Sequence, residues 1–314
     1  MKVFFLKPEE DWFVDRMGDE FARASEHDVL FSDVRRSDVI WLAAPWCWRR
    51  VPQSELADKP VLCTIHHEVP WKIDAARRQE FAERDQFVDL YHVPCAQTRE
   101  TLAQYKLVPV EKIRVLPYWC DSSVWKEHDS AECRAEFGLL ESQFIVGSFQ
   151  RDTEGGDLKT PKLEKGPDLF CDYVIDVLKD EQKLDVRVFL SGWRRQYAMK
   201  RLADASVPYT YIELPQLDKL SRMYSALDLY VVSSRFEGGP QALLECAMQR
   251  VPIVSRDMGM ARDVLHSSCI VDVGKLPIYK APSKEAIEHA HDRALSLELR
   301  SHARSFDSLL RELR

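Results

Sequence analysis

The sequence lacks the features of membrane-spanning, exported and nucleic-acid-binding proteins. No apolar run approaches the roughly 20 residues that a membrane-spanning helix needs, and the apolar start Val3–Leu6 is too short for a signal peptide. The formal net charge is −7, whereas binding to a phosphate backbone needs an excess of basic residues. We therefore expect no nucleic-acid partner and at most peripheral contact with the inner face of a membrane.

The cysteine pattern excludes two further classes of protein. The eight cysteines form no C-x-x-C pair, and several lie in apolar runs typical of strands, such as Val61–Cys63. Free, buried thiols in a reducing cytoplasm explain this pattern better than a disulfide framework or a zinc site. No cluster of Asp, His or Cys has metal-ligand spacing. The sequence therefore predicts a cytoplasmic protein that uses no metal and no cofactor.

Short apolar runs alternate with stretches of helical spacing, a pattern typical of parallel α/β folds. The pattern occurs twice within 314 residues, which is enough for two domains. We expect one N-terminal domain over 1–128 and a second domain over 129–282. C-terminal helices are expected over 283–314, with Ser283 as N-cap, packing back across the domain junction. Ligands of doubly wound sheets bind at the carboxyl ends of strands, so chemistry is expected there.

The apolar runs predict strands in both halves of the chain: 3–6, 38–43, 60–66, 90–94, 113–116, 144–148, 185–190, 209–212, 228–232, 252–254 and 270–271. Helical spacing or start signals predict helices over 11–25, 71–87, 131–137, 167–178, 217–225 and 240–248.

The segment Ser233–Glu245 follows an apolar strand and opens a helix. Gly238 and Gly239 allow the backbone to approach a ligand closely, and Pro240 suits the first helical turn. The N–H groups and the positive dipole end at such a helix start form an anion site suited to phosphate.

Two glutamates of this segment are candidate ligand contacts. Glu237 stands just before the helix and Glu245 lies inside it; a carboxylate accepts strong charge-assisted hydrogen bonds from sugar hydroxyls. Without the surrounding motif, Glu237 would be explained as a charge at a helix start and Glu245 as a solvent-exposed helix residue. The preceding strand and the Gly-Gly-Pro insert favour ligand binding.

The segment resembles the paired-glutamate signature of glycosyltransferase family 4, the group 1 glycosyl transferases, which include sucrose synthases and bacterial lipopolysaccharide and exopolysaccharide transferases. Ile113–Asp121 resembles the end of the family's first domain, and Phe144–Ser148 with the later Lys165–Gly166 its second-domain opening. The motifs span most of residues 60–265. The resemblance implies the GT-B fold: two Rossmann-like α/β domains with doubly wound parallel sheets facing a central cleft, and a helical C-terminal tail. It makes 1–128 the acceptor-side domain and 129–282 the nucleotide-sugar-binding domain.

The resemblance also implies a function. The chain is expected to be a retaining hexosyltransferase of polysaccharide biosynthesis that moves a sugar from a nucleotide-diphosphate sugar to a glycan, lipid-linked or small-molecule acceptor. Glu237 would contact the donor sugar, Glu245 the ribose, and the backbone between them the diphosphate. Two cations, Arg151 and Lys165, would stabilise the leaving diphosphate without a metal; Lys159 and Lys162 are the alternative basic residues.

Histidines follow the strand predicted over 60–66. The resemblance assigns His66 to the donor sugar or its reacting centre, with His67 as the alternative. A histidine at the carboxyl end of a parallel strand is placed for ligand contact, although a lone histidine is more often structural.

Some segments depart from the family's pattern. Lys7–Trp12 stands where the family has a glycine-rich loop, Arg250 where it has a glycine, and Gly259–Arg262 where it has G-x-P-E. Ala44–Pro52, with two tryptophans and two arginines, reads as acceptor-side recognition or as an aromatic core edge. An alternative function is a catalytically idle nucleotide-sugar-binding subunit, and the sequence does not indicate the oligomeric state.

Overall fold

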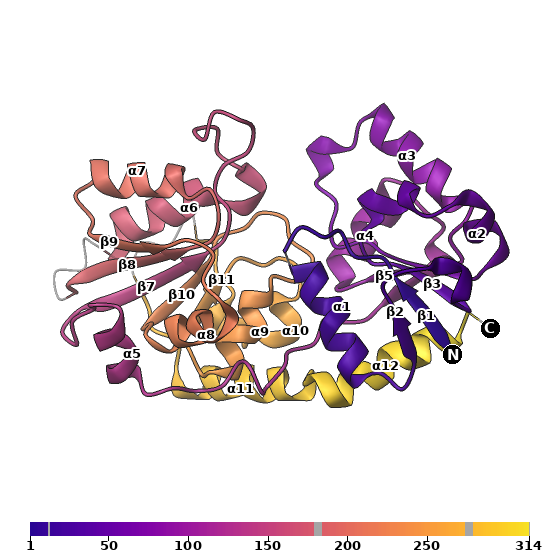
Figure 1. The fold of residues 1–314 in the computed structure, drawn as a ribbon. Helices are drawn as coiled ribbons and strands as arrows, with labels where there is room; N and C mark the ends of the chain where they lie inside the picture. Colours follow the sequence, from indigo (N-terminus) through magenta and orange to yellow (C-terminus); the bar gives the residue numbers. More distant parts are fainter. Residues whose placement is uncertain (12, 179–183, 274–278, 314) are drawn as a thin grey trace. The chain divides into compact units, whose positions relative to one another are not determined.

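The computed structural model of the chain describes residues 1–11, 13–178, 184–273 and 279–313. These residues form two compact units, Met1–Asp121 with Ser296–Arg314, and Ser122–Leu295. Each unit contains one parallel β-sheet and several helices (Figure 1). The expectation of two Rossmann-like sheets is therefore confirmed. The predicted domain boundaries, 1–128, 129–282 and 283–314, stay a prediction.

The first unit has a six-stranded sheet in the order β2-β1-β3-β4-β5-β6, parallel throughout. Its strands are β1 (Lys2–Phe5), β2 (Asp28–Leu30), β3 (Val39–Leu42), β4 (Val61–Thr64), β5 (Leu90–Val93) and β6 (Ile113–Val115). Its helices are α1 (Phe13–Ala24), α2 (Gln53–Asp58), α3 (Ala75–Asp85), α4 (Ala96–Gln104) and α12 (Leu299–Arg311). Because β2 and β3 lie on opposite sides of β1, the strand order reverses between β1 and β3, which makes a topological switch point.

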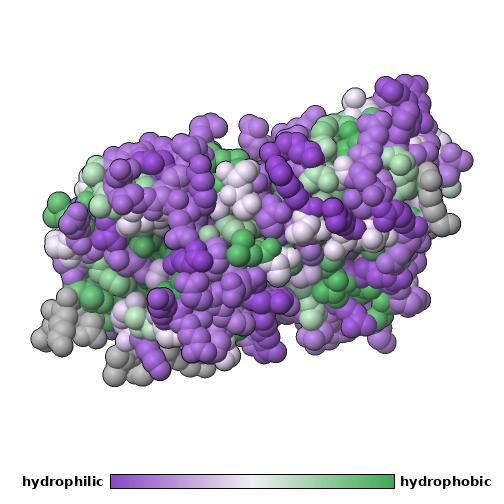
Figure 2. All heavy atoms as spheres, turned by 90° about the horizontal axis from the view of Figure 1, so that it is seen from below, coloured by the Kyte–Doolittle hydropathy of each residue, from purple (hydrophilic) through white to green (hydrophobic). Residues whose placement is uncertain are grey.

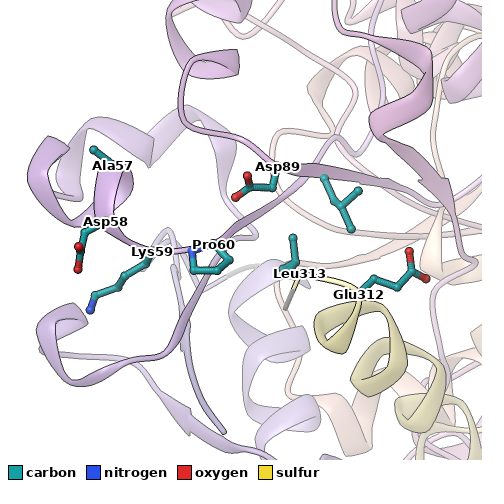
Figure 3. Close-up of a pocket in the computed structure, with 8 residues that line it drawn as sticks. Ala57, Asp58, Lys59, Pro60, Asp89, Glu312 and Leu313 are labelled. Atoms are coloured by element: carbon teal, nitrogen blue, oxygen red, sulfur yellow. The ribbon is translucent and has the colours of Figure 1, made fainter.

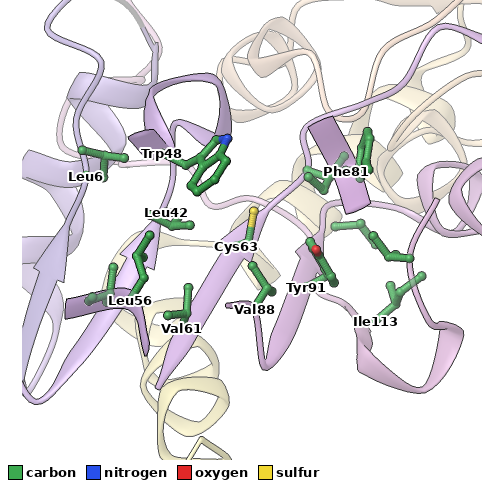
Figure 4. Packing of buried hydrophobic residues seen from close by; sticks show 14 of the residues in the cluster. Leu6, Leu42, Trp48, Leu56, Val61, Cys63, Phe81, Val88, Tyr91 and Ile113 are labelled. Carbon is green, nitrogen blue, oxygen red and sulfur yellow. The ribbon is translucent and has the colours of Figure 1, made fainter. Parts of the chain in front are cut away.

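Apolar side chains cover both faces of this sheet. In the cluster of Figure 4, Leu42, Cys63 and Tyr91 of the central strands belong to one core with Leu56 of α2 and Phe81 of α3. Strands β3 and β4 are buried at every position, as expected for parallel strands covered on both faces.

The C-terminal helix α12 packs into the same unit. Phe306 of α12 stacks on Trp41 of β3 with 5.6 Å between ring centres, and its ring also meets that of Phe21 of α1. Ser25 donates a hydrogen bond to Asp307 at 2.5 Å. These contacts explain why residues far apart in the sequence share one core.

The second unit has a five-stranded parallel sheet in the order β11-β10-β7-β8-β9. Its strands are β7 (Phe144–Phe149), β8 (Val186–Ser191), β9 (Tyr209–Ile212), β10 (Leu229–Val232) and β11 (Ile253–Ser255). Its helices are α5 (Ser130–Glu136), α6 (Pro167–Asp172), continued by a π-helical turn (Tyr173–Leu178), α7 (Gln196–Asp204), α8 (Leu217–Ser225), α9 (Gln241–Met248), α10 (Ala261–Val264) and α11 (Lys284–Ser296). Its switch point lies between β7 and β10.

Some predicted elements differ from the structure. The strand predicted over 270–271 is a single bridge between Ser255 and Ile270. The helix predicted over 71–87 begins at Ala75, because the Asp74 side chain accepts the N–H of Arg77 at 2.8 Å and caps it there. Strand β2 and helices α2, α4 and α7 were not predicted, and Trp12 lies outside the described residues.

The capping prediction at the C-terminal helices is confirmed, since Ser283 Oγ accepts the N–H of Ala286 at 3.2 Å. Among the described residues, each helix is too short or too polar to cross a membrane. Figure 2 shows a face covered mostly by hydrophilic side chains, with hydrophobic ones in small separate areas.

Candidate functional site

The chain segments after β7 and β10 meet at the switch point of the second unit. Arg235 and Phe236, after β10, donate their N–H groups to the carbonyl oxygen of Glu164 at 2.8 and 3.1 Å. Gly166 has φ +62°, and a Cβ there would lie 2.1 Å from the carbonyl oxygen of Ser233. Only glycine allows this close approach. The segment Lys165–Gly166 is thereby fixed against the end of β10.

Lys165 and Glu237 come together at this point. Lys165 Nζ forms an ion pair with Glu237 Oε1, and the side chains are 19% and 10% exposed. Ser234 Oγ also donates to Glu237 Oε1 at 3.3 Å. The residues that the sequence assigned to the diphosphate and to the donor sugar are therefore direct neighbours.

The backbone after Glu237 leads into α9. Pro240 occupies the N-cap of α9 and makes no side-chain cap hydrogen bond. Its carbonyl oxygen accepts the N–H of Leu243 at 3.0 Å, so the chain turns into the helix at this point, and helix starts of this kind attract anions. Gly238 and Gly239 immediately precede it. Gly259 has φ +54°, and a Cβ there would lie 2.5 Å from the carbonyl oxygen of Gly238. No such role was predicted from the sequence for Gly259, whose backbone lies directly against Glu237 and Gly238.

Glu245 lies on α9 with only 4% of its surface exposed. Its Oε2 accepts a hydrogen bond from the hydroxyl of Tyr224 at 2.7 Å. Burial, together with the nearby Glu245, raises the pKa of Tyr224 well above its ordinary value. The alternative of a solvated helix residue is therefore wrong, while the contact with a ribose stays a prediction.

Further basic side chains gather around Lys165. Burial lowers the pKa of Lys162, and the charge of Lys165 lowers it further; Lys162 Nζ lies 3.8 Å from Glu164 Oε1. Arg151 donates from Nε to the carbonyl oxygen of Thr153 at 2.8 Å. Its pKa is lowered by burial and by Arg194.

The structure distinguishes Lys159 from Lys162, the two alternative basic residues of the sequence analysis. Lys159 is exposed, whereas Lys162 belongs to the basic cluster with Lys165 and Arg151, whose charges both lower its pKa. The signal in the sequence was the spacing of Lys162 and Lys165, three residues apart before Gly166.

In the first unit, His66 follows β4 at its carboxyl end. Its Nε2 lies 2.8 Å from the carbonyl oxygen of Ala43, and its Nδ1 lies 2.5 Å from the hydroxyl of Tyr118. Because a carbonyl only accepts, Nε2 carries the proton and Nδ1 accepts from Tyr118. Burial lowers the pKa of His66 to about 4, and His67 lowers it slightly. His66 is therefore a neutral imidazole with both nitrogens hydrogen-bonded.

The loop after β1, where the family has glycines, is held by side chains. Arg50 pairs with Glu9 at 2.6 Å, and Trp46 Nε1 donates to Glu10 Oε1 at 3.2 Å. Asp15 accepts the N–H groups of both glutamates at 2.9 Å. This arrangement lies at the switch point between β1 and β3 and leaves Trp46 40% exposed.

A hollow of about 490 Å³ in the first unit does not belong to either switch point (Figure 3). Pro60 and Asp89, which line it, directly precede β4 and β5, so it lies at the amino ends of these strands. Doubly wound sheets bind ligands at the opposite edge. Within the described parts of the chain, no group of three or more metal-ligating side chains comes together.

The family described as glycosyl transferases group 1 matches residues 156–289. This stretch lies within the second unit and contains Lys165, Glu237 and Glu245, whereas Arg151 precedes it. No curated protein matches the sequence.

Several solved structures match the chain over its whole length. HepE from Anabaena, solved in complex with UDP, has a TM-score of 0.73 at 13% identity over 99% of this chain and 100% of its own; it has also been solved in complex with UDP-glucose. Sucrose-phosphate synthase from Thermosynechococcus elongatus has a TM-score of 0.69 at 12% identity over 100% and 99%. A glycosyltransferase from Rickettsia africae has a TM-score of 0.67 at 10% identity over 99% and 98%.

At these identities the likeness to the solved structures shows the fold alone. The family match covers the segment that holds the ion pair and the start of α9. Residues 156–289 match the group 1 glycosyl transferases, glycosyltransferase family 4, and the chain as a whole has the GT-B fold.

Proposed function

We propose that the chain transfers a hexose from a nucleoside-diphosphate sugar to an acceptor hydroxyl, with retention of the anomeric configuration and without a metal ion. The observation that carries the proposal is the Lys165–Glu237 ion pair at the switch point of the second unit, next to the start of α9. A cation, a carboxylate and a helix start together suit a ligand that has both phosphates and hydroxyls.

The donor diphosphate would bind Arg151, Lys165 and the backbone of Gly238, Gly239 and Pro240. When Lys165 turns to the phosphates, Glu237 is released to accept hydrogen bonds from the donor sugar. Basic groups fixed before the reaction stabilise the negative charge that the leaving diphosphate gains.

The bond between the anomeric carbon and the phosphate oxygen breaks, and a bond from the acceptor oxygen forms on the same face. The acceptor proton passes to the departing phosphate. Glu245 is assigned to the ribose; the hydrogen bond that its Oε2 accepts from Tyr224 supports this by holding the carboxylate in place.

His66 is assigned to the reacting sugar, with His67 as the alternative. Because both nitrogens of His66 are engaged, contact with a sugar hydroxyl requires exchange of the bond to Tyr118 or to Ala43. Steady-state kinetics on His66→Ala and His67→Ala decide between them, since losses of about 10²-fold in kcat are typical of groups acting on developing charge. If both variants keep full kcat, neither histidine is catalytic.

UDP-glucose is the first donor to test, because HepE has been solved in complex with UDP-glucose. The acceptor is a glycan, a lipid-linked sugar or a small molecule, with the loops after β1 and β3 as the proposed acceptor side. A cytoplasmic location, or one at the inner face of a membrane, stays a prediction.

The test combines binding and turnover. Calorimetry with UDP measures the donor site, and release of UDP from UDP-glucose, with and without a panel of sugar acceptors, measures transfer. Binding with turnover supports the proposal. Binding with no release in either assay supports the idle binding subunit instead, and failure of a panel of nucleoside diphosphates to bind contradicts both.

A further inference from the structure

Two fully buried charges lie beside the basic cluster of the second unit. The side chains of Arg195 and Asp152 are both 0% exposed, and Arg195 Nε donates to Asp152 Oδ2 at 3.0 Å. Arg195 directly precedes α7, and Asp152 follows the end of β7 by three residues. Removing two charges from water is costly, so a buried pair is weak as a source of stability and calls for another role.

Arg195 ties the ends of two strands together. Its Nη1 donates to the carbonyl oxygens of Ser148 in β7 and of Ser191 in β8, the latter at 2.8 Å, and its Nη2 donates to Ser148 Oγ at 3.2 Å. The planar guanidinium is suited to such fixed multiple contacts, which a lysine cannot reproduce. Arg195 is therefore immobilised at the carboxyl edge of the sheet.

Asp152 joins this anchor to the loop that carries the basic cluster. Its carbonyl oxygen accepts the N–H of Lys162 at 2.6 Å, and the carbonyl oxygen of Lys162 accepts the N–H of Lys165 at 2.9 Å. Arg151 is its direct neighbour in the sequence, and a bridge between Thr153 and Pro161 closes the loop.

The pair is not optimised for stability. Asp152 Oδ2 also accepts the N–H of Ala198 at 3.2 Å, but Oδ1 is buried and has no hydrogen-bond partner among the described residues. An unsatisfied buried oxygen is destabilising and calls for an explanation. A role in holding the neighbouring basic residues supplies one.

We propose that the Arg195–Asp152 pair is the positioning element of the diphosphate site, holding Arg151, Lys162 and Lys165 so that one diphosphate meets all three. The proposal rests on the proposed function. Three like charges repel each other: burial is the main cause of the lowered pKa of Lys162, and the charges of Lys165 and Arg151 lower it further. A rigid anchor keeps them in place before the ligand binds, which is the requirement for preorganised charge stabilisation.

The experiment measures binding of UDP and of uridine to the full chain, with uridine titrated in competition with UDP. In Asp152→Asn and in Arg195→Lys, the affinity for UDP is expected to fall roughly tenfold or more, the scale of a lost charge-assisted contact. The affinity for uridine, which has no phosphate, is expected to stay within about twofold of wild type, well below that tenfold scale. Lys162→Ala keeps the backbone hydrogen bonds of its loop and removes one of the three cations, so its affinity for UDP is also expected to fall relative to that for uridine; this variant tests the three-cation part of the proposal if the buried variants do not fold.

The matched control is a second ion pair of the same unit. Arg134 and Asp228 pair at 2.6 Å at the amino ends of β7 and β10, where Asp228 also accepts the N–H of Ile145 at 2.7 Å. Asp228→Asn removes the same charge at the opposite edge of the sheet. It is expected to lower the melting temperature but to leave the ratio of UDP to uridine affinity unchanged.

The outcomes separate this inference from the proposed function. If Arg151→Ala and Lys165→Ala leave the affinity for UDP unchanged, the diphosphate site itself is misassigned. If they weaken UDP binding but the Asp152 and Arg195 variants keep the wild-type ratio, only the positioning role is overturned. If Lys162→Ala keeps that ratio, Lys162 does not meet the diphosphate and the proposal is overturned as stated. An equal loss of UDP and uridine binding in the buried variants likewise overturns it, because it indicates a general structural defect.

Discussion

Replacing Glu237 by glutamine is expected to change product binding and sugar transfer in opposite directions. The substitution keeps the size of the side chain and removes the charge that pairs with Lys165. The two side chains are 10% and 19% exposed, so solvent screens their charges only in part. In the proposed function, the phosphates of UDP meet Lys165 in competition with this carboxylate and are repelled by it.

The size of the effect follows from Coulomb's law. Two unit charges about 6 Å apart interact by roughly 2–3 kcal/mol at an effective dielectric constant of about 20. Rearrangement of the pair offsets part of this repulsion. We therefore expect Glu237→Gln to bind UDP more tightly by about 1–2 kcal/mol, on the order of tenfold. Transfer from UDP-glucose is expected to lose about 10²-fold or more in kcat, because an amide accepts weaker hydrogen bonds from the sugar as charge develops.

Calorimetric titration with UDP and steady-state kinetics with UDP-glucose measure the two effects. Lys165→Met is the matched control, since it removes the other half of the pair and is expected to weaken UDP binding. Weaker or unchanged UDP binding in Glu237→Gln would refute the competition between carboxylate and phosphate. Full kcat in the same variant would refute the contact with the donor sugar.

Four further predictions test other parts of the site. Glu245→Ala is expected to weaken UDP binding by about 1.5–3 kcal/mol, the scale of a hydrogen bond to a charged group; unchanged affinity in calorimetry would refute the ribose assignment. Turnover is expected to survive EDTA, because basic side chains rather than a metal ion are proposed to stabilise the diphosphate; loss of activity that magnesium or manganese restores would contradict this. Burial lowers the pKa of His66 to about 4. Between pH 6.5 and 4, His66 is therefore protonated in the unfolded chain and neutral in the folded chain. The free energy of unfolding should therefore fall by up to about 3 kcal/mol between pH 6.5 and 4, and by less in His66→Gln, as measured by urea titration at each pH. Gly166→Ala should destabilise the chain by more than about 2 kcal/mol, because a Cβ would meet the carbonyl oxygen of Ser233. Gly138→Ala is the control: Gly138 has φ +64° with nothing within 4 Å, so this variant measures the cost of the backbone conformation alone.

The central strands could be predicted because their burial is visible in the sequence. β3, β4 and β10 are covered on both faces and appear as continuous apolar runs. β2 has three residues with an exposed or intermediate pattern, so neither periodicity nor a long apolar run marks it. The start of α3 was misplaced for a local reason, since the cap at Asp74 wins over the apolar residues before it.

The candidate site was predictable where its residues are close in the sequence. The segment around Gly238 and the Lys165–Gly166 pair were predicted from short motifs of neighbouring residues. Arg195 and Asp152 are 43 residues apart, and nothing in the local sequence distinguishes them from solvated charges. The same holds for His66, whose position after a strand was predictable. The bonds that occupy both its nitrogens come from Ala43, just after β3, and Tyr118, in the segment after β6.

The two switch points differ in the chemistry that their loops offer. In the second unit, Gly166 and Gly259 allow backbone segments to approach each other closely, next to the start of α9 and a cluster of cations, which suits phosphate. In the first unit, the loop after β1 presents Glu9 and Glu10, anchored by Arg50 and Trp46. Carboxylates repel phosphate and accept hydrogen bonds from hydroxyls. The loop that replaces the family's glycines therefore fits the acceptor hydroxyls of the proposed reaction, and the donor phosphates belong to the second unit.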